Sequence, residues 1–131
     1  MTDRELVEKA AAMQEYAYCP YSNFPVGAAL LCEDGTVFTG CNVESAAYGN
    51  TICAERMALL KAVSEGRRSG FSALAVAGRS DDPCWPCGSC RQMLYEFAPD
   101  LRVLAVGKDG SFEEATLSEL LPHGFGAAHL K

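Results

Sequence analysis

Two short stretches of the chain carry the residue types of a hydrolytic metal site. Cys53 and Glu55 stand two residues apart, and Cys87 and Cys90 form a Cys-x-x-Cys pair. Three thiolates leave one position of a tetrahedral zinc ion open, whereas a structural zinc site normally closes with four protein ligands. A carboxylate beside such an ion supplies the base that takes and returns protons when water is the nucleophile. The two stretches together predict a catalytic zinc site with Glu55 as the proton carrier.

The Cys-x-x-Cys pair alone has two other interpretations. In a reducing compartment it can be a redox pair or half of a structural zinc site. The upstream Cys53 and Glu55, with a helical pattern after each motif, favour catalysis. Cys84 lies three residues before Cys87 and could compete for the metal or simply pack. We predict packing, because a fourth thiolate would close the position that catalysis needs.

Length, net charge and cysteine content limit the classes of protein to which the chain can belong. The 131 residues suit one domain, taken as residues 1–131, and the net charge of −6 argues against a long nucleic acid as the partner. No apolar run approaches the ~20 residues of a membrane span, and the N-terminal residues are too polar for a secretory signal. Seven cysteines, an odd number, indicate a reducing, cytoplasmic setting with free thiols.

The rest of the chain supplies the elements that must position these residues. Hydrophobic periodicity predicts helices at residues 3–17, 52–65 and 87–97. A capping box predicts a further, short helix at residues 116–122. Apolar runs predict strands at residues 26–32, 71–78 and 101–107, and the hairpin signal Asp34-Gly35 predicts a partner strand at residues 36–42. The strand–helix–strand order of the last part implies a parallel pair with a right-handed crossover. The architecture is therefore one mixed sheet with helices on both faces.

The spacing of Cys53 and Glu55 also predicts where the metal lies. Positions i and i+2 do not share a helix face, so the metal must sit off the N-terminus of the 52–65 helix, where first-turn side chains converge. The helix dipole favours thiolates there. This helix is apolar on most sides, and we expect it to be deeply buried.

Five stretches resemble the small, homotetrameric cytidine deaminases. They are residues 20–29 (PYSNFPVGAA), 40–44 (GCNVE), 53–56 (CAER), 86–92 (PCGSCRQ) and 119–122 (ELLP). A metal ligand two residues before Glu, followed by Pro-Cys-x-x-Cys, is the general pattern of zinc deaminases, here with Cys53 in place of a histidine. Asn42 with Glu44, and the Pro-Tyr-Ser-x-Phe loop, narrow the resemblance to enzymes of free nucleosides.

The resemblance implies an α/β fold, a three-layer α/β/α sandwich around a mixed five-stranded sheet. It implies hydrolytic deamination of cytidine and 2′-deoxycytidine to uridine and 2′-deoxyuridine with release of ammonia, in pyrimidine salvage. One Zn²⁺ per subunit would be held by Cys53, Cys87 and Cys90, with Glu55 as the catalytic residue. The implied partners are a small nucleoside and further copies of the chain in a homotetramer, with no nucleic acid and no membrane.

The resemblance also assigns substrate-binding residues. Asn42 and Glu44 would hydrogen-bond the ribose 3′-hydroxyl, and the backbone at Ala54 would contact the base. Phe24 would pack on the pyrimidine, although by residue type alone it could equally anchor the core. Three further residues would help to build a neighbouring subunit's pocket: Ala46, Tyr48 and Phe125.

Charge at the metal raises a separate question. Three thiolates on Zn²⁺ leave a net charge of −1, which should weaken the acidification of bound water. Our hypothesis is that Arg56 and the helix dipoles offset this charge, with Arg91 as a second candidate. The alternative is that Arg56 is an ordinary surface side chain on a helix.

Two rival functions share parts of this pattern. A deaminase of aminonucleoside antibiotics, of the blasticidin type, would have the same fold and zinc motifs, but Glu44 and the Phe24 loop argue against it. A non-enzymatic binding module with a structural zinc would have no use for a carboxylate at Glu55.

Overall fold

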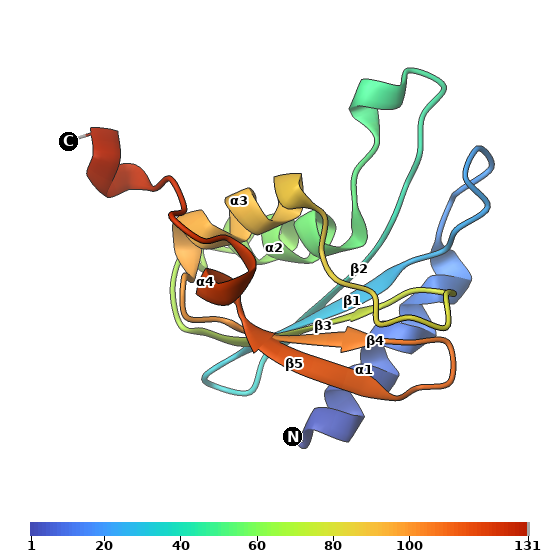
Figure 1. Cartoon of the computed structure of the whole chain (residues 1–131), viewed down its shortest axis with the longest axis horizontal. Helices are drawn as coiled ribbons and strands as arrows, with labels where there is room; N and C mark the ends of the chain where they lie inside the picture. The colour runs from blue at the N-terminus through green and yellow to red at the C-terminus, as the bar shows by residue number, and fades with distance from the viewer. Residues whose placement is uncertain (131) are drawn as a thin grey trace.

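A five-stranded mixed sheet forms the middle layer of the fold (Figure 1), with the strand order β2-β1-β3-β4-β5. The structure is a computed structural model that describes residues 1–130. Its strands are β1 (Gly27–Cys32), β2 (Val37–Cys41), β3 (Phe71–Ala77), β4 (Arg102–Val106) and β5 (Phe112–Thr116). β3 and β4 pair in parallel, and the other three pairs are antiparallel. The parallel pair expected from the strand–helix–strand order is confirmed.

Helices cover both faces of the sheet and complete the expected three-layer sandwich. The helices are α1 (Asp3–Ala12), α2 (Ala54–Ser64), α3 (Gly88–Phe97) and α4 (Leu117–Leu120). Three short 3₁₀ turns accompany them, at Met13–Tyr16, Tyr48–Asn50 and Ala127–Leu130. Of the 130 residues described, none belongs to a helix that is long and apolar enough to cross a bilayer.

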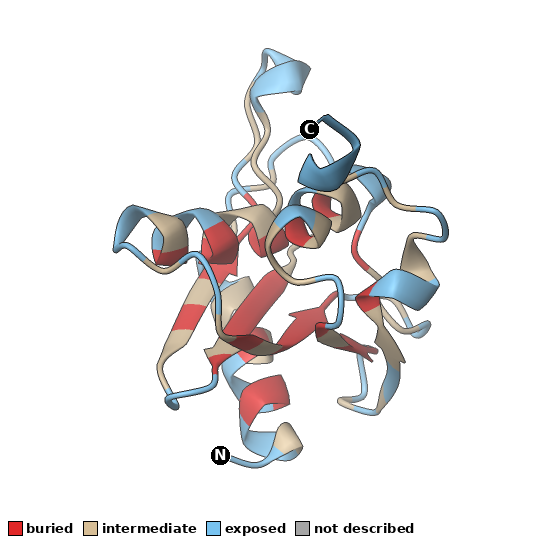
Figure 2. Cartoon of the chain, turned by 90° about the vertical axis from the view of Figure 1, so that its left-hand side faces the viewer, coloured by how far each residue is buried: buried red, intermediate tan, exposed pale blue. Residues whose placement is uncertain are grey.

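Alternation along the strands divides the core between the two faces of the sheet. On β3, Leu74 and Val76 pack toward α2 and α3, whereas Ala73 and Ala75 pack toward α1. Figure 2 shows the buried residues concentrated in the sheet and on the inner sides of the helices. Alanines on the α1 side let that helix lie close to the sheet, so small residues set the spacing of this layer.

The strand β5 was not among the strands that the apolar runs predict. Its sequence is Phe-Glu-Glu-Ala-Thr, and it lies at the edge of the sheet with Glu113 and Glu114 exposed. Arg102 of β4 binds Glu114 at 3.0 Å and Asp3 at 2.7 Å, which ties the edge strand and α1 to the sheet. A search for apolar runs misses such a strand, because much of its surface faces water. The five-stranded sheet implied by the resemblance is confirmed.

The expected deep burial of the helix at 52–65 was wrong for the single chain. α2 buries one face, through Ala54, Glu55, Ala58, Leu59 and Ala62. Leu60 on the outer side is 44% exposed. The helix belongs to the outer layer of the sandwich, so only the side toward the sheet and α3 is covered.

Close contact between α2 and the sheet depends on Gly40 of β2. A Cβ atom at this position would lie 2.3 Å from the carbonyl oxygen of Ala54 and 2.8 Å from the nitrogen of Ala58. Both are backbone atoms of the first turns of α2, which cannot move aside as a flexible side chain would. The glycine therefore sets the distance between β2 and the start of α2.

We expect Gly40→Ala to destabilise the fold and to displace the start of α2. Overpacking of this kind costs about 1–3 kcal/mol or more. Urea unfolding measures the loss of stability, and Gly49→Ala is the matched control, because a Cβ there meets nothing within 4 Å. Equal unfolding midpoints for the two variants would contradict this account of the packing.

Candidate metal centre and active site

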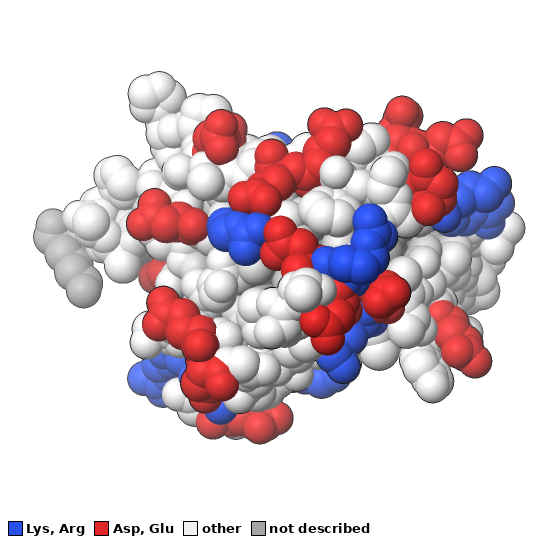
Figure 3. Space-filling model, turned by 90° about the horizontal axis from the view of Figure 1, so that it is seen from below, with Lys and Arg blue, Asp and Glu red and all other residues white. Residues whose placement is uncertain are grey.

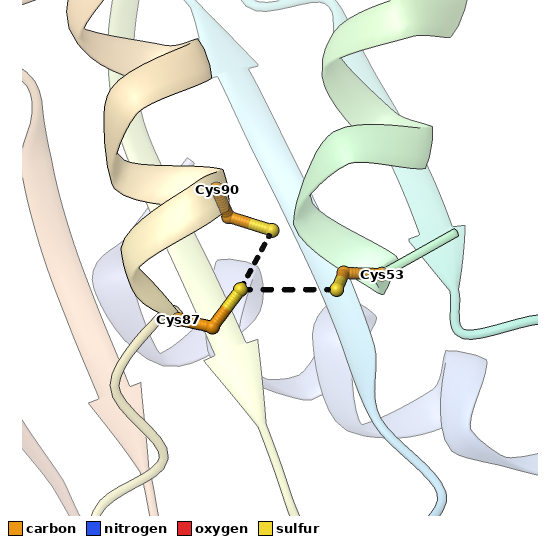
Figure 4. A group of neighbouring side chains, drawn as sticks. All are labelled: Cys53, Cys87 and Cys90. Atoms are coloured by element: carbon orange, nitrogen blue, oxygen red, sulfur yellow. Dashed lines mark hydrogen bonds between the residues drawn. The ribbon is translucent and has the colours of Figure 1, made fainter. Parts of the chain in front are cut away.

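The N-terminal ends of α2 and α3 bring three cysteine thiols together (Figure 4). Cys53 is the N-cap of α2, Cys87 is the N-cap of α3, and Cys90 lies in the first turn of α3. The Sγ atom of Cys87 is 3.9 Å from that of Cys53 and 3.5 Å from that of Cys90. The three thiols therefore meet off the N-terminus of α2, which is where the metal is predicted to lie.

The spacing of the three sulfur atoms suits a zinc ion. Zinc–sulfur bonds of about 2.3 Å in tetrahedral geometry place sulfur atoms about 3.8 Å apart. All three sulfurs lie within 4.8 Å of one another, so they could hold an ion with little rearrangement. Thiolates are soft ligands that favour zinc among the common divalent ions.

Cys84 packs beside this group and is not part of it, as predicted. Its Sγ atom lies 2.9 Å from where a Cβ on Gly78 would be, so it fills the space left by that glycine. Burial raises the pKa of the Cys84 thiol to about 11, which keeps it protonated at neutral pH. The described residues thus offer three thiols rather than four to one ion.

The thiols differ in how readily each gives up its proton. Hydrogen bonds from Cys90 and Cys87 and the charge of Arg56 lower the pKa of Cys53 to about 5, against the opposing effect of burial. The pKa of Cys90 is raised, first by its hydrogen bond to Cys53 and then by burial. Of these two thiols, Cys53 therefore gives up its proton more readily than Cys90.

Arg56 and Arg91 occupy different positions relative to the cluster. Arg56 donates from Nη2 to the carbonyl oxygen of Thr51 at 2.8 Å, while its buried Nε has no hydrogen-bond partner among the described residues. Arg91 donates to the carbonyl oxygens of Pro86 at 2.7 Å and Leu120 at 2.9 Å. Arg56 is the cation that lowers the pKa of Cys53, whereas Arg91 ties α3 to its flanking segments.

Glu55 lies beside the cysteine cluster in the first turn of α2. Its side chain is almost fully buried, at 4% exposure. Burial raises the pKa of Glu55 above its ordinary value of 4.5, and the negative charge of Cys53 raises it further. A carboxyl group with a raised pKa in a cavity is suited to exchange protons near neutral pH.

A cavity of about 300 Å³ opens beside Cys53 and Cys87. Glu55 lines it, together with all four residues that the resemblance assigns to the substrate: Phe24, Asn42, Glu44 and Ala54. The described residues that line it include two carboxylates but no Lys, Arg or His. Its size and mixed lining fit a small polar molecule with an apolar ring.

Asn42 and Glu44 also hold the loop that carries Phe24. Asn42 accepts from the N–H of Val26 at 2.9 Å and donates to the carbonyl oxygen of Phe24 at 2.9 Å. One oxygen of Glu44, Oε1, accepts from the N–H groups of Tyr21 at 3.0 Å and Ser22 at 3.1 Å. Hydrogen bonds from Ser22 and Tyr21 lower the pKa of Glu44, so it stays charged.

The three residues assigned to a neighbouring pocket lie outside this cavity. Ala46 and Tyr48 are exposed on the arm between β2 and α2, and Phe125 is exposed in the C-terminal segment (Figure 1). The Tyr48 ring lies 5.9 Å from the Tyr21 ring, at an adjoining cavity that Glu44 also lines. Phe125 stacks on His129 at 5.2 Å.

Sequence reasoning missed four residues that line the cavity: Ser22, Val26, Thr51 and Trp85. Ser22 stands within the quoted 20–29 stretch, but its hydroxyl was not considered. Thr51 and Trp85 have no signal beyond their positions, just before Cys53 and just before the Pro-Cys-x-x-Cys motif. Side chains of such loops are placed by the fold, and no local spacing indicates where they point.

Comparison with known proteins identifies the family. Residues 1–106 match the family model described as the cytidine and deoxycytidylate deaminase zinc-binding region. The chain belongs to this family. The match agrees with the three-cysteine group and makes zinc the metal expected there.

Individual relatives cover nearly the whole chain. A cytidine deaminase of Sporosarcina psychrophila is 48% identical over 131 residues, which cover 99% of this chain and 96% of that protein. A crystal structure of cytidine deaminase from Burkholderia pseudomallei superposes with a TM-score of 0.93 at 48% identity, covering 95% of this chain and 100% of that chain. A blasticidin-S deaminase of Bacillus cereus is 32% identical over 127 residues, covering 92% and 89% of the two chains.

We expect Cys87→Ser to lose bound zinc and Cys84→Ser to keep about one ion per chain. The first removes one of three ligands, whereas the second removes only packing. Metal analysis of the dialysed, folded variants gives the answer, with circular dichroism to check folding. Zinc loss in Cys84→Ser as complete as in Cys87→Ser would show that Cys84 is a ligand.

Proposed function

We propose that the protein is a zinc-dependent cytidine deaminase that converts cytidine and 2′-deoxycytidine to uridine and 2′-deoxyuridine with release of ammonia. The observation that carries this proposal is the buried Glu55, which lines one cavity together with Cys53 and Cys87 of the three-thiol group and with Asn42 and Glu44. Membership of the family, and the names of the relatives at 48% identity, support it. The whole chain, residues 1–131, would act as one catalytic domain in the cytoplasm, in pyrimidine salvage.

Glu55 carries the protons of the proposed reaction. Zinc held by Cys53, Cys87 and Cys90 would supply a water molecule whose pKa lies near 7 rather than 15.7. The Glu55 carboxylate takes one proton from the water and passes it to ring N3 while the water oxygen bonds to C4. It then takes the second proton of that oxygen and gives it to the amino group, so that the C4–N bond breaks, ammonia leaves and a C4 carbonyl remains. One residue serves both steps, because a carboxylate that has acted as a base is then an acid.

The cavity lining accounts for substrate binding in this proposal. Phe24 packs on the pyrimidine, the backbone at Ala54 contacts the base, and Asn42 and Glu44 bind the 3′-hydroxyl. The loop of Phe24 is already fixed by hydrogen bonds to Asn42 and Glu44, so little ordering is needed when substrate binds.

The charge of the lining favours nucleosides over nucleotides. Glu44 and Glu55 are acidic side chains, which would repel a phosphate group. The described lining residues include no Lys, Arg or His to bind one. Acidic and basic side chains are interspersed on the α1 side of the molecule (Figure 3), and the net charge of −6 does not favour a polynucleotide. We therefore assign a free nucleoside as the substrate and no nucleic acid or membrane as a partner.

We further propose a homotetramer in which each cavity is completed by a neighbour. Ala46, Tyr48 and Phe125 are exposed on segments that extend from the body, where they are free to reach another chain. Leu60 leaves an apolar outer side on α2 that a second copy would cover. Sedimentation at micromolar concentration tests this assembly, and a monomer would contradict it.

A blasticidin-type deaminase is the second candidate. The relative of that name is 32% identical, against 48% for the cytidine deaminase, so sequence similarity favours cytidine. Both candidates need Glu55 and zinc, and the choice between them rests on the substrate alone.

We expect Glu55→Gln to lower turnover by about 10³-fold while zinc content and fold are kept, because the amide cannot carry protons. The ultraviolet change on conversion of cytidine to uridine measures the rate, with 2′-deoxycytidine, 2′-deoxycytidylate, cytosine and blasticidin S as alternative substrates. Wild-type protein should act on the two nucleosides and lose activity with a chelator. Action on cytosine but not on cytidine would contradict the assignment of Asn42 and Glu44 to the sugar. Full activity in Glu55→Gln would contradict the role of Glu55 as the proton carrier.

Arg56 is the residue that we propose to offset the excess charge of the three thiolates. We expect Arg56→Gln to bind zinc about tenfold more weakly, since loss of a group that supports a metal ligand typically costs about 10–100-fold in metal affinity. Competition with a chromogenic chelator measures this affinity. Arg68→Gln is the control, because it removes the same charge from an exposed position beyond α2. Equal zinc affinity in the two variants would contradict charge compensation by Arg56 and leave it an ordinary helix side chain.

A further inference from the structure

The hydroxyl group of Ser22 connects the side chain of Glu44 to the backbone of Phe24, and all three residues line the cavity. It donates a hydrogen bond to Oε2 of Glu44 and accepts one from the N–H of Phe24 at 3.1 Å. A serine hydroxyl has one donor and two acceptor positions, so it makes both bonds at once. Ser22 and Glu44 stand 22 residues apart, one before β1 and the other after β2, so the bond joins two separate segments at the cavity wall.

The two oxygens of Glu44 are used unequally. Oε1 accepts from two backbone N–H groups, those of Tyr21 and Ser22, and these fill both of its acceptor positions. Oε2 accepts from the Ser22 hydroxyl and has one position left. Oε2 is therefore the oxygen with capacity for a ligand, and Ser22 is the group that fixes it.

Glu44 has no cation to orient it. The ion pairs of the described residues involve Asp34, Asp3 and Glu114, and none involves Glu44. Its orientation depends on three donors from residues 21 and 22, of which the hydroxyl is the one that a substitution can remove. Loss of that donor would let the carboxylate rotate about its hydrogen bonds to the backbone.

We propose that Ser22 is a positioning residue that aims Oε2 of Glu44 at the sugar of the substrate. This inference rests on the proposed function, in which Glu44 binds the 3′-hydroxyl. A contact to the sugar is present both in the bound substrate and in the transition state, so its loss raises KM and leaves kcat nearly unchanged. A role in folding or in catalysis would give a different pattern.

Ser22→Ala should raise KM for cytidine about tenfold and change kcat by less than about twofold, in line with the loss of a hydrogen bond to a charged group. Ser22→Thr keeps the hydroxyl and should restore most of the affinity. Ser22→Cys keeps the size with a weak donor and should resemble Ser22→Ala. Ser64→Ala, at the far end of α2, is the matched control and should match the wild type.

A double-mutant cycle separates this role from the contact between Ser22 and Phe24. In a Glu44→Ala background, Ser22→Ala should change KM by less than about twofold further, because the group that it positions is gone. Zinc content and melting temperature are measured for every variant to show that each is folded and loaded.

Three results would contradict the inference, and they are distinguishable from failure of the proposed function. An unchanged KM in Ser22→Ala, the same increase of KM in both backgrounds, or a fall in kcat alone would each assign Ser22 to the loop rather than to Glu44. Wild-type protein that does not deaminate cytidine would overturn the proposed function, and this inference would fall with it.

Discussion

The mutual repulsion of three thiolates is the constraint around which this fold is arranged. Sulfur atoms 3.5 to 3.9 Å apart cannot all carry a negative charge without a cation between them. The pKa directions agree with this, because the hydrogen bond between Cys90 and Cys53 lowers the pKa of Cys53 and raises that of Cys90. Two helix N-termini and Arg56 supply positive potential, but zinc is needed to ionise the whole group. Metal binding and proton release are therefore one event.

The topology explains why the two helix N-termini meet. α2 leads into the start of β3, and α3 follows from its end, so both helices run antiparallel to this strand. Their N-termini must then lie at the carboxyl end of β3, where open α/β sheets commonly bind ligands. The parallel pairing of β3 with β4 requires the α3 crossover, and Gly40 lets α2 approach β2. The position of the zinc site thus follows from strand order and from one missing Cβ atom.

Most of this arrangement could be predicted from residue spacing. The i and i+2 relation of Cys53 and Glu55 placed the metal off a helix end, and continuous apolar runs located the strands that are buried on both faces. β5 was missed because an edge strand with glutamates on its surface has no such run. The exposure of Leu60 could not be predicted either. The sequence shows that this side chain is apolar, but not whether it is covered by its own chain or by another. Trp85 and Ser22 lie in loops, where the fold alone decides what a side chain meets.

Asn42 and Glu44 show how one polar side chain can serve both fold and function. Sequence reasoning assigned them to a sugar, and the structure shows that they also hold the Phe24 loop through hydrogen bonds. The two uses are compatible, because an amide and a carboxylate have more hydrogen-bonding positions than the loop occupies. Each bond to the loop fixes the orientation of the position that remains. Asn42 and Glu44, which close the cavity wall, therefore also set the direction from which a substrate hydroxyl can be bound. The conformational entropy of ordering these side chains is lost when the chain folds rather than when substrate binds.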